Sequence, residues 1–383
     1  MDIKISRVEE ERLRAELEAR SDIDAMRMKH YLAMPDLSRT SGSPLHEIVE
    51  RVKALPVFKG FDDIEIPEIV PASISFDFFD FPSTHPARSA SDTYYVDKEN
   101  ILRTHDTVFW YYYLNQPEIK ERIARGESMG ALCYGKVYRK DEIDRRHMNI
   151  FHQMGGWFLT PESDPLSIED LKNALSQVVK SVFGENTKFR FNPDIFPYTD
   201  PSLEVEVGVT GAAAVAAGSE WIEILGGGIP KANVLKKMGV TGYHGWAFGF
   251  GLERLAIIGT EVPDIRLFWS TDKRVKKQLR LGQKFVEVSK YPPVVRDISF
   301  IVTKGFVPNN YFDLVRDVAG DMVEQVALID TYENTEKLGD DKVSYAYRLT
   351  YRSLDRTLKN EEVNALHAKL EAATVKNCGA TIR

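Results

Sequence analysis

One stretch of the chain decides the fold, and it reads GWAFGFGLERL over residues 245–255. Its glycines alternate with bulky residues, as in a strand that lies against a ligand or another backbone, because glycine has no side chain to pack there. The strand is predicted to turn directly into a helix whose first turn holds Glu253 and Arg254. An arginine at a helix start opposes the helix dipole, which favours anions. Arg254 is therefore predicted to bind an anion such as a nucleotide phosphate.

Length and composition limit the possible classes of protein. The chain has 383 residues, which fits two domains with a helical extension. It is 43% hydrophobic and 28% charged, as in an ordinary globular protein, and contains no apolar run long enough to span a membrane. Two distant cysteines, Cys133 and Cys378, predict neither a disulfide framework nor a zinc site. The net charge of -7 argues against nonspecific coating of nucleic acid, although one basic face would be enough for specific binding.

The N-terminus is rich in acidic residues and has no apolar core. Transit peptides avoid acidic residues, and secretory signals need an apolar segment. We therefore predict a cytoplasmic protein, with the mature form of an organellar protein as the alternative.

The hydrophobic pattern changes along the chain. Residues 1–56 are predicted to be helical, including an amphipathic helix over 45–55, with a packing or RNA-facing role. Ile168–Phe183 has the period of a helix with one buried face. Strands are predicted at 92–96, 135–139, 203–209, 221–225 and 246–250. Strands with few helices between them indicate an α+β domain, an antiparallel sheet carrying helices on one side.

The sequence KYPP at 290–293 predicts the start of a second domain. Beyond it the predicted order is strand, helix, two strands, helix and a short last strand. The corresponding ranges are 297–302, 311–318, 323–332, 343–351, 360–372 and 380–382. This order predicts a ferredoxin-like α+β domain with two helices on one face of a four-stranded sheet.

Two further motifs suit a nucleotide. GKVYRKD at 135–141, followed by His147 and FHQ at 151–153, is predicted to deliver Arg139 to a phosphate and an aromatic ring to a purine. The alternative is an Arg–Asp salt bridge on a surface hairpin. WIEILGGG at 221–228 places Glu223 on a strand beside a glycine turn, where its oxygens could hold Mg²⁺. A solvated strand glutamate is the alternative.

Together these stretches resemble the catalytic domain of phenylalanyl-tRNA synthetase, a class II enzyme. HPAR at 85–88, LRTH at 102–105 and FPYTDPS at 196–202 agree with it, and Pro67 lies where the first class II motif has its proline. YPPVVRDISF at 291–300 and YRSLDRTL at 351–358 resemble that enzyme's ferredoxin-fold anticodon-binding domain. The resemblance covers roughly residues 58–383 and implies a class II catalytic domain over 57–283 and an anticodon-binding domain over 284–383. The segment 1–56, predicted to be helical from its own pattern, is expected to be an N-terminal helical extension.

The resemblance also implies an activity and a set of site residues. The expected reaction joins phenylalanine to tRNA(Phe) with ATP and Mg²⁺, in a monomer of the single-chain organellar form. Arg139 would hold the α-phosphate, Phe151 would stack on adenine and Arg254 would grip the γ-phosphate. Asp141 and His147 would support the nucleotide, and Glu223 would bind Mg²⁺. The residues implied for amino acid binding are His105, Asp106, Thr107, Gln153, Phe196, Tyr198 and Ala247.

The chain departs from the family pattern around the substrate's amino group. The family has His-Thr-Ser or His-Thr-Thr where this chain has His105-Asp106-Thr107. It has Phe-His-Gln-x-Glu where this chain ends in Gly155. Losing the glutamate that balances an ammonium should cost several kcal/mol, so we hypothesise that Asp106 supplies the charge. The alternative is that Asp106 faces solvent and amino acid binding is weak.

The predicted anticodon-binding domain has a cluster of cations at Arg348, Arg352, Arg356 and Lys359. Strand alternation places the first two on one face, where they could bind phosphates or unpaired bases. The alternative is a set of salt bridges. Two rival functions remain: a paralogue that adenylates a different substrate, and a tRNA-binding regulator that has lost activation.

Overall fold

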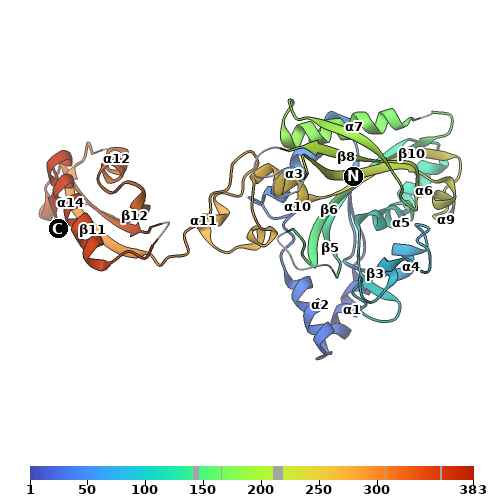
Figure 1. The fold of residues 1–383 in the computed structure, drawn as a ribbon, viewed down its shortest axis with the longest axis horizontal. Helices are drawn as coiled ribbons and strands as arrows, with labels where there is room; N and C mark the ends of the chain where they lie inside the picture. The colour runs from blue at the N-terminus through green and yellow to red at the C-terminus, as the bar shows by residue number, and fades with distance from the viewer. Residues whose placement is uncertain (141–145, 165, 210–218, 307, 354–355) are drawn as a thin grey trace. The chain divides into compact units, whose positions relative to one another are not determined.

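The computed structural model covers residues 1–383 and describes all of them except 141–145, 165, 210–218, 307 and 354–355. The chain divides into two compact units, Met1–Phe285 and Val286–Arg383 (Figure 1). Among the described residues, no helix combines the length and the apolar character needed to cross a membrane.

The first unit is built on an eight-stranded sheet of order β1-β2-β5-β6-β10-β9-β8-β7. Its strands are β1 (Asp2–Lys4), β2 (Asp62–Glu65), β5 (Met129–Tyr138), β6 (Ile150–Pro161), β7 (Phe189–Asp194), β8 (Thr199–Gly208), β9 (Trp221–Pro230) and β10 (Tyr243–Gly251). The pairings from β5 to β7 are antiparallel, which confirms the predicted sheet. At the other edge β1 and β2 pair in parallel, as do β2 and β5.

Three helices pack together against this sheet: α3 (Pro44–Lys53), α7 (Ile168–Phe183) and α10 (Leu252–Thr260) (Figure 1). The predicted helix α7 begins with a capping box between Ser167 and Asp170 and buries Leu171, Leu175 and Val178. The predicted change from strand to helix within residues 245–255 is confirmed, because β10 ends at Gly251 and α10 begins at Leu252.

The structure describes nine further α-helices and strands in the first unit. They are α1 (Val8–Glu18), α2 (Ile23–Ala33), β3 (Ile69–Pro71), α4 (Ala72–Phe76), β4 (Asn100–Leu102), α5 (Phe109–Leu114), α6 (Pro117–Ala124), α9 (Ala232–Lys237) and α11 (Lys273–Lys276). Trp110 of α5 stacks on Trp157 of β6 with ring centroids 4.8 Å apart, at the centre of a large apolar core.

Three local predictions are wrong. Residues 1–56 are not helical throughout, because Asp2–Lys4 forms strand β1 and pairs with β2. Residues 92–96 form no strand and contribute only an isolated bridge between Tyr95 and Ile101. Asp97 accepts hydrogen bonds from the backbone of Glu99 and Asn100, each at 2.7 Å, so the chain turns there. Residues 226–228 form no turn, because they lie inside β9.

The segment 1–56 contacts the central strands through buried polar groups. Lys136 of β5 donates to the carbonyl oxygens of Leu32 and Met34, at 3.1 and 2.9 Å. The backbone N–H of Leu37 donates to Nε2 of His152 at 2.9 Å. The loop after α2 is therefore fixed to β5, which ends just before Arg139, and to β6, which carries Phe151.

The second unit confirms the predicted ferredoxin-like arrangement. Its elements are β11 (Val294–Thr303), α12 (Pro308–Ala319), β12 (Val323–Tyr332), α13 (Thr335–Leu338), β13 (Lys342–Tyr351), α14 (Asn360–Cys378) and β14 (Thr381–Ile382). The sheet order is β12-β13-β11-β14. Ile298 and Phe300 alternate on the face of β11 that meets Val315 of α12 and Leu370 of α14 in one core.

Candidate active site

The first unit contains a cavity of about 920 Å³ over the central strands. It is lined by His105, Asp106, Thr107, Arg139, His147, Phe151, Gln153, Phe196, Tyr198, Glu223, Ala247 and Arg254. These are all the predicted ATP-site and amino-acid-site residues except Asp141, which lies outside the described residues. Sheet order and register bring together side chains from eight separate stretches of sequence.

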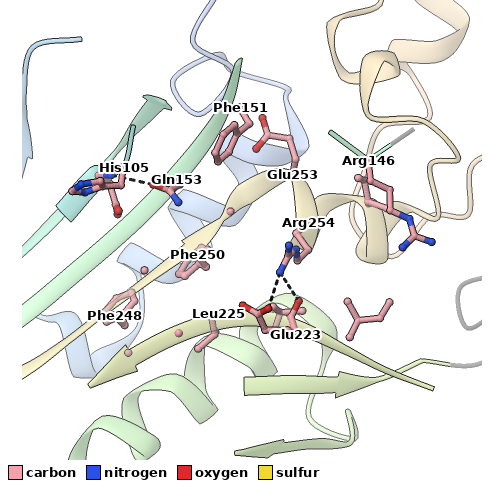
Figure 2. Close-up of a pocket in the computed structure, with 18 of the residues that line it drawn as sticks. His105, Arg146, Phe151, Gln153, Glu223, Leu225, Phe248, Phe250, Glu253 and Arg254 are labelled. Atoms are coloured by element: carbon pink, nitrogen blue, oxygen red, sulfur yellow. Dashed lines mark hydrogen bonds and ion pairs between the residues drawn. The ribbon is translucent and has the colours of Figure 1, made fainter. Parts of the chain in front are cut away.

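Two residues predicted for different tasks meet in the cavity. Figure 2 shows Arg254 reaching from α10 toward Glu223 on β9. Arg254 Nη1 lies 3.2 Å from the Glu223 carbonyl oxygen and 3.4 Å from its Oε2. Both side chains are 49% exposed, so they can exchange this contact for a phosphate.

Arg139 and Phe151 form a second contact in the cavity. The Arg139 guanidinium carbon lies 5.2 Å from the centre of the Phe151 ring, and Arg139 Nε donates to the Thr104 carbonyl oxygen at 2.9 Å. His147 and Arg146 are exposed and line the same cavity. Arg146 was not among the predicted site residues, although it lies in the basic stretch after Arg139.

A buried pair of residues holds these groups in place. Glu253 is 3% exposed and accepts from the His152 backbone N–H at 3.0 and 2.8 Å. His152 Nδ1 lies 2.6 Å from Glu253 Oε1, and Nε2 accepts from Leu37, so the proton is on Nδ1. The pair joins β6 to the first turn of α10. Sequence reasoning missed this role, although each residue adjoins a predicted one.

A cluster of aromatic side chains forms another part of the cavity lining. Phe196 and Tyr198 stack with ring centroids 6.1 Å apart, and Ala247 is buried beside them. Phe81 and Trp110 add rings at 6.3 and 5.9 Å from Tyr198. Neither was a predicted site residue, although both lie in conspicuously aromatic runs, 76–81 and 109–114.

Two features shape this aromatic cluster. A Cβ on Gly226 would lie 2.7 Å from Cζ of Phe196, so the glycine admits the ring. Burial raises the pKa of Tyr198 to about 12, and the negative charge of the Asp106 carboxylate adds to the rise. Tyr198 is therefore a neutral wall residue at physiological pH.

Asp106 lies between the aromatic cluster and the strands. It is 4% exposed, which contradicts the alternative in which it faces solvent. Its backbone N–H donates to Gln153 Oε1 at 3.0 Å. Burial raises the pKa of Asp106 to about 7, opposed by the positive charges of Arg103 and Arg139. Burial lowers the pKa of His105 to about 4, and its Nε2 donates to the Ser75 carbonyl oxygen at 3.0 Å.

The four cations predicted to bind RNA differ in their surroundings. Arg348 is exposed and forms two hydrogen bonds with Asp297, at 2.8 and 2.7 Å. Arg356 pairs with Glu362, and Lys359 precedes the first residue of α14. Arg352 is only 14% exposed: it contacts Glu324 at 2.7 Å and donates to the Tyr291 carbonyl oxygen.

The neighbouring tyrosines of this strand, Tyr347 and Tyr351, are buried in the core of the second unit. They cannot stack on bases from there. Arg352 likewise fixes residues 289–291 to the sheet.

Comparison with known proteins extends these findings. The family described as tRNA synthetases class II core domain (F) matches residues 29–279, and the ferredoxin-fold anticodon binding domain matches residues 289–383. The chloroplastic/mitochondrial phenylalanine–tRNA ligase of Arabidopsis thaliana is 38% identical over 85% of this chain and 73% of its own length. The mitochondrial phenylalanine–tRNA ligase of Mus musculus is 34% identical over 88% and 80%. The α subunit of the ligase from Caldicellulosiruptor bescii is 35% identical but covers 62% of this chain.

The relatives that match across both units are mitochondrial or chloroplastic, so the prediction of a cytoplasmic protein is wrong. The acidic residues on which it rested belong to folded structure. They lie in or next to the helices α1 and α2, where Glu10 is buried and pairs with Arg14 at 2.5 Å. The chain belongs to the phenylalanyl-tRNA synthetase family, in the single-chain mitochondrial and chloroplastic type that carries a class II core and a ferredoxin-fold anticodon-binding domain.

Proposed function

We propose that this chain is a phenylalanine–tRNA ligase that forms phenylalanyl-adenylate from phenylalanine and ATP and transfers the aminoacyl group to tRNA(Phe). One observation carries the proposal for the site: the same cavity is lined by the cationic side chains of Arg139 and Arg254 and by a cluster of aromatic rings around Tyr198. That arrangement matches a substrate pair made of a nucleoside triphosphate and an amino acid with a benzyl side chain.

The first step needs positioning and charge neutralisation more than proton transfer. A carboxylate oxygen of phenylalanine attacks the α-phosphorus in line, the new O–P bond forms, and the bond to the β-phosphate oxygen breaks, releasing pyrophosphate. Arg139 neutralises charge at the α-phosphate and Arg254 binds the γ-phosphate. In the second step a terminal ribose hydroxyl of tRNA attacks the carbonyl carbon, and AMP leaves.

The purine is proposed to stack on Phe151, with His147 near the phosphates. Glu223 suits Mg²⁺ because its half-exposed carboxylate lines the cavity, and Mg²⁺ typically uses one or two carboxylates together with water and phosphate oxygens. Within the described residues no cluster of three His, Cys, Asp or Glu side chains could hold a metal by itself. The ion would supply charge neutralisation on the phosphates when bound.

The benzyl side chain is proposed to lie against the aromatic cluster. Phe196, Tyr198, Phe81 and Trp110 offer edge and face contacts, worth about 0.5–1.5 kcal/mol per pair. Ala247 sets the depth of the enclosure.

We further propose three functional segments in a monomer: an extension over 1–56 that supports the site, a catalytic domain over 57–283 and an anticodon-binding domain over 284–383. In the last, the exposed Arg348, Arg356 and Lys359 would contact RNA. Arg352 would support that surface from beneath, because its contacts are internal.

ATP–pyrophosphate exchange against the twenty amino acids, followed by charging of tRNA(Phe), tests the proposal. Exchange driven by phenylalanine together with charging is the expected result. Exchange with a different amino acid alone would establish the paralogue. Retained tRNA binding without any exchange would establish the regulator.

A further inference from the structure

We propose that Asp106 binds the α-ammonium group of the amino acid substrate, and that residue 155 is glycine because the Asp106 carboxylate occupies the space a side chain there would need. This inference rests on the proposed function. It assigns Asp106 as a binding residue of that site and makes the residue tolerated at position 155 depend on the residue at position 106.

The first observation is an unpartnered buried oxygen. Asp106 lines the cavity and is 4% exposed, and its Oδ2 has no hydrogen-bond partner among the described residues. Burying a carboxylate oxygen without a partner is costly. A cationic ligand that enters the cavity would remove that cost.

The second observation is that the Asp106 carboxylate lies against two glycines of neighbouring strands. Gly155 of β6 and Gly249 of β10 are directly paired in the sheet. A Cβ built on Gly155 would overlap Asp106 Oδ2, whereas one on Gly249 would lie at an ordinary 3.5 Å from Oδ1. Any side chain at position 155 is therefore incompatible with Asp106 in its present place. The two residues are 49 positions apart in sequence and form one steric unit.

The third observation is the set of acceptors around Asp106. An ammonium group has three N–H donors and is best satisfied by three acceptors. Gln153 Oε1 is held beside Asp106 by the 3.0 Å bond from the Asp106 backbone and has a second lone pair. His105 also lines the cavity, and its buried Nδ1 has no hydrogen-bond partner among the described residues. Because Nε2 is the donor, Nδ1 carries a lone pair.

The charged and titratable groups facing Asp106 come from several elements. Arg103 follows β4, Arg139 follows β5, Cys133 lies within β5 and Tyr198 precedes β8. Burial raises the pKas of Cys133 and Tyr198 to about 12, so both are neutral at physiological pH. The two arginines are permanent cations, yet the pKa of Asp106 remains raised to about 7 because burial dominates.

A titration near neutrality gives the ammonium site a distinctive pH dependence. An ammonium binds the ionised carboxylate, so below pH 7 substrate binding must displace a proton from Asp106. The KM for phenylalanine should then rise by up to about tenfold for each pH unit below 7. The KM for ATP should not follow this trend.

Asp106→Asn tests the binding role in the full-length protein, by exchange titrated with phenylalanine and with ATP. The expected result is a KM for phenylalanine raised about a hundredfold, a KM for ATP within threefold of the original, and no remaining pH trend between 5.5 and 7.5. The analogue 3-phenylpropanoate has the ring and the carboxylate of phenylalanine but no ammonium group. In the unsubstituted protein it should bind more weakly than phenylalanine, because it cannot pair with Asp106. The preference for phenylalanine over this analogue should collapse in the variant.

An Asp106→Asn protein with unchanged KM, pH profile and analogue preference would overturn the assignment while leaving the ligase activity standing. Absence of phenylalanine-dependent exchange in the unsubstituted protein would instead contradict the proposed function itself.

A paired substitution tests the dependence between the positions. Gly155→Glu alone should abolish exchange, because the new side chain overlaps Asp106. The double variant D106T/G155E returns both positions to the family pattern, and should recover the KM for phenylalanine to within about tenfold. The recovered chain needs only a small shift near the Phe248 carbonyl oxygen, 3.0 Å from the new Cβ. Activity of Gly155→Glu with Asp106 in place, or a double variant no better than the single, would overturn the steric argument.

Folding is monitored separately. Circular dichroism and tryptophan fluorescence of each variant distinguish a loss of the fold from a loss of substrate binding. If Gly155→Glu does not fold, the double variant tests the steric argument through folding. Recovery of folding in the double variant would support the argument, and failure to recover would overturn it.

Discussion

The imidazole of His152 and the carboxylate of Glu253 form a buried pair, with Nδ1 2.6 Å from Oε1. Glu253 also accepts from the backbone N–H of His152. The sequence neighbours of this pair are Phe151 and Arg254, which Figure 2 places in the same cavity. The distance between the proposed adenine-stacking ring and the proposed γ-phosphate ligand is therefore set by a contact that involves neither of them.

Removing Glu253 should damage both stability and nucleotide binding. Glu253→Ala leaves the backbone N–H and the Nδ1–H of His152 buried without an acceptor, which should cost about 2–4 kcal/mol in free energy of unfolding. The KM for ATP should rise about tenfold as Phe151 and Arg254 lose their fixed separation. All five tryptophans lie in Met1–Phe285, so tryptophan fluorescence in urea reports this unit alone. Glu185→Ala, an exposed residue paired with Lys180, is the matched control and should change stability by less than about 0.5 kcal/mol. Equal behaviour of the two variants would refute a positioning role.

Replacing Arg254 should impair the use of ATP while leaving stability nearly unchanged. Its contacts with Glu223 are half-exposed, so Arg254→Ala should change the free energy of unfolding by less than about 1 kcal/mol. Loss of a charge-assisted contact to a phosphate should lower kcat/KM for ATP by about 10–100-fold or more. Urea unfolding and exchange kinetics measure the two quantities. Arg125→Ala, exposed and paired with Glu127 away from the cavity, should alter neither. A large stability loss in Arg254→Ala would indicate a structural role instead.

Asp106 should reduce the stability of the ligand-free protein. Its pKa is raised by burial from 3.8 to about 7, so the folded state binds more protons than the unfolded state between these values. Its contribution to stability is fully present below pH 4 and is lost as pH rises through 7. Asp106→Asn should thus be more stable than the unsubstituted protein by on the order of 4 kcal/mol at pH 8 and about half as much at pH 5. Urea unfolding followed by tryptophan fluorescence at both pH values measures the difference. A gain that does not grow with pH would contradict an ionising buried carboxylate.

Arg348 of β13 and Arg352, which directly follows this strand, should have different functions. Arg352→Ala breaks contacts to Glu324 and Tyr291 inside the second unit, and should lower its stability by about 1–3 kcal/mol. Because that unit has no tryptophan, an earlier transition in circular dichroism with an unchanged fluorescence transition would identify the effect. Phenylalanine-dependent exchange should persist while charging of tRNA falls.

Arg348→Ala is the companion variant, since its pair with Asp297 is exposed. Stability should change by less than about 1 kcal/mol, and the KM for tRNA should rise about tenfold if the guanidinium contacts RNA. An unchanged KM for tRNA would assign Arg348 to its salt bridge alone.

Local pattern predicted most of the elements that carry the site. The alternation of glycine and bulky residues before Arg254 placed a strand and a helix correctly, and the 3.6-residue period placed α7. Such signals are local, because they depend on which face of one element is buried. Prediction failed at residues 92–96, where an Asp97 side chain competes for backbone hydrogen bonds, and at residues 226–228, where close contacts keep glycines within a strand.

By itself, the sequence determined the two-part organisation, the family resemblance and the chemical types of the site residues. Those properties follow from composition, periodicity and short motifs. Only the tertiary structure decided which distant residues act together: Asp106 over Gly155, Glu253 on His152, and Phe81 and Trp110 around Tyr198. It also separated the internal Arg352 from the exposed Arg348. The physical reason is that strand order and register fix which side chains become neighbours, and a local pattern fixes neither.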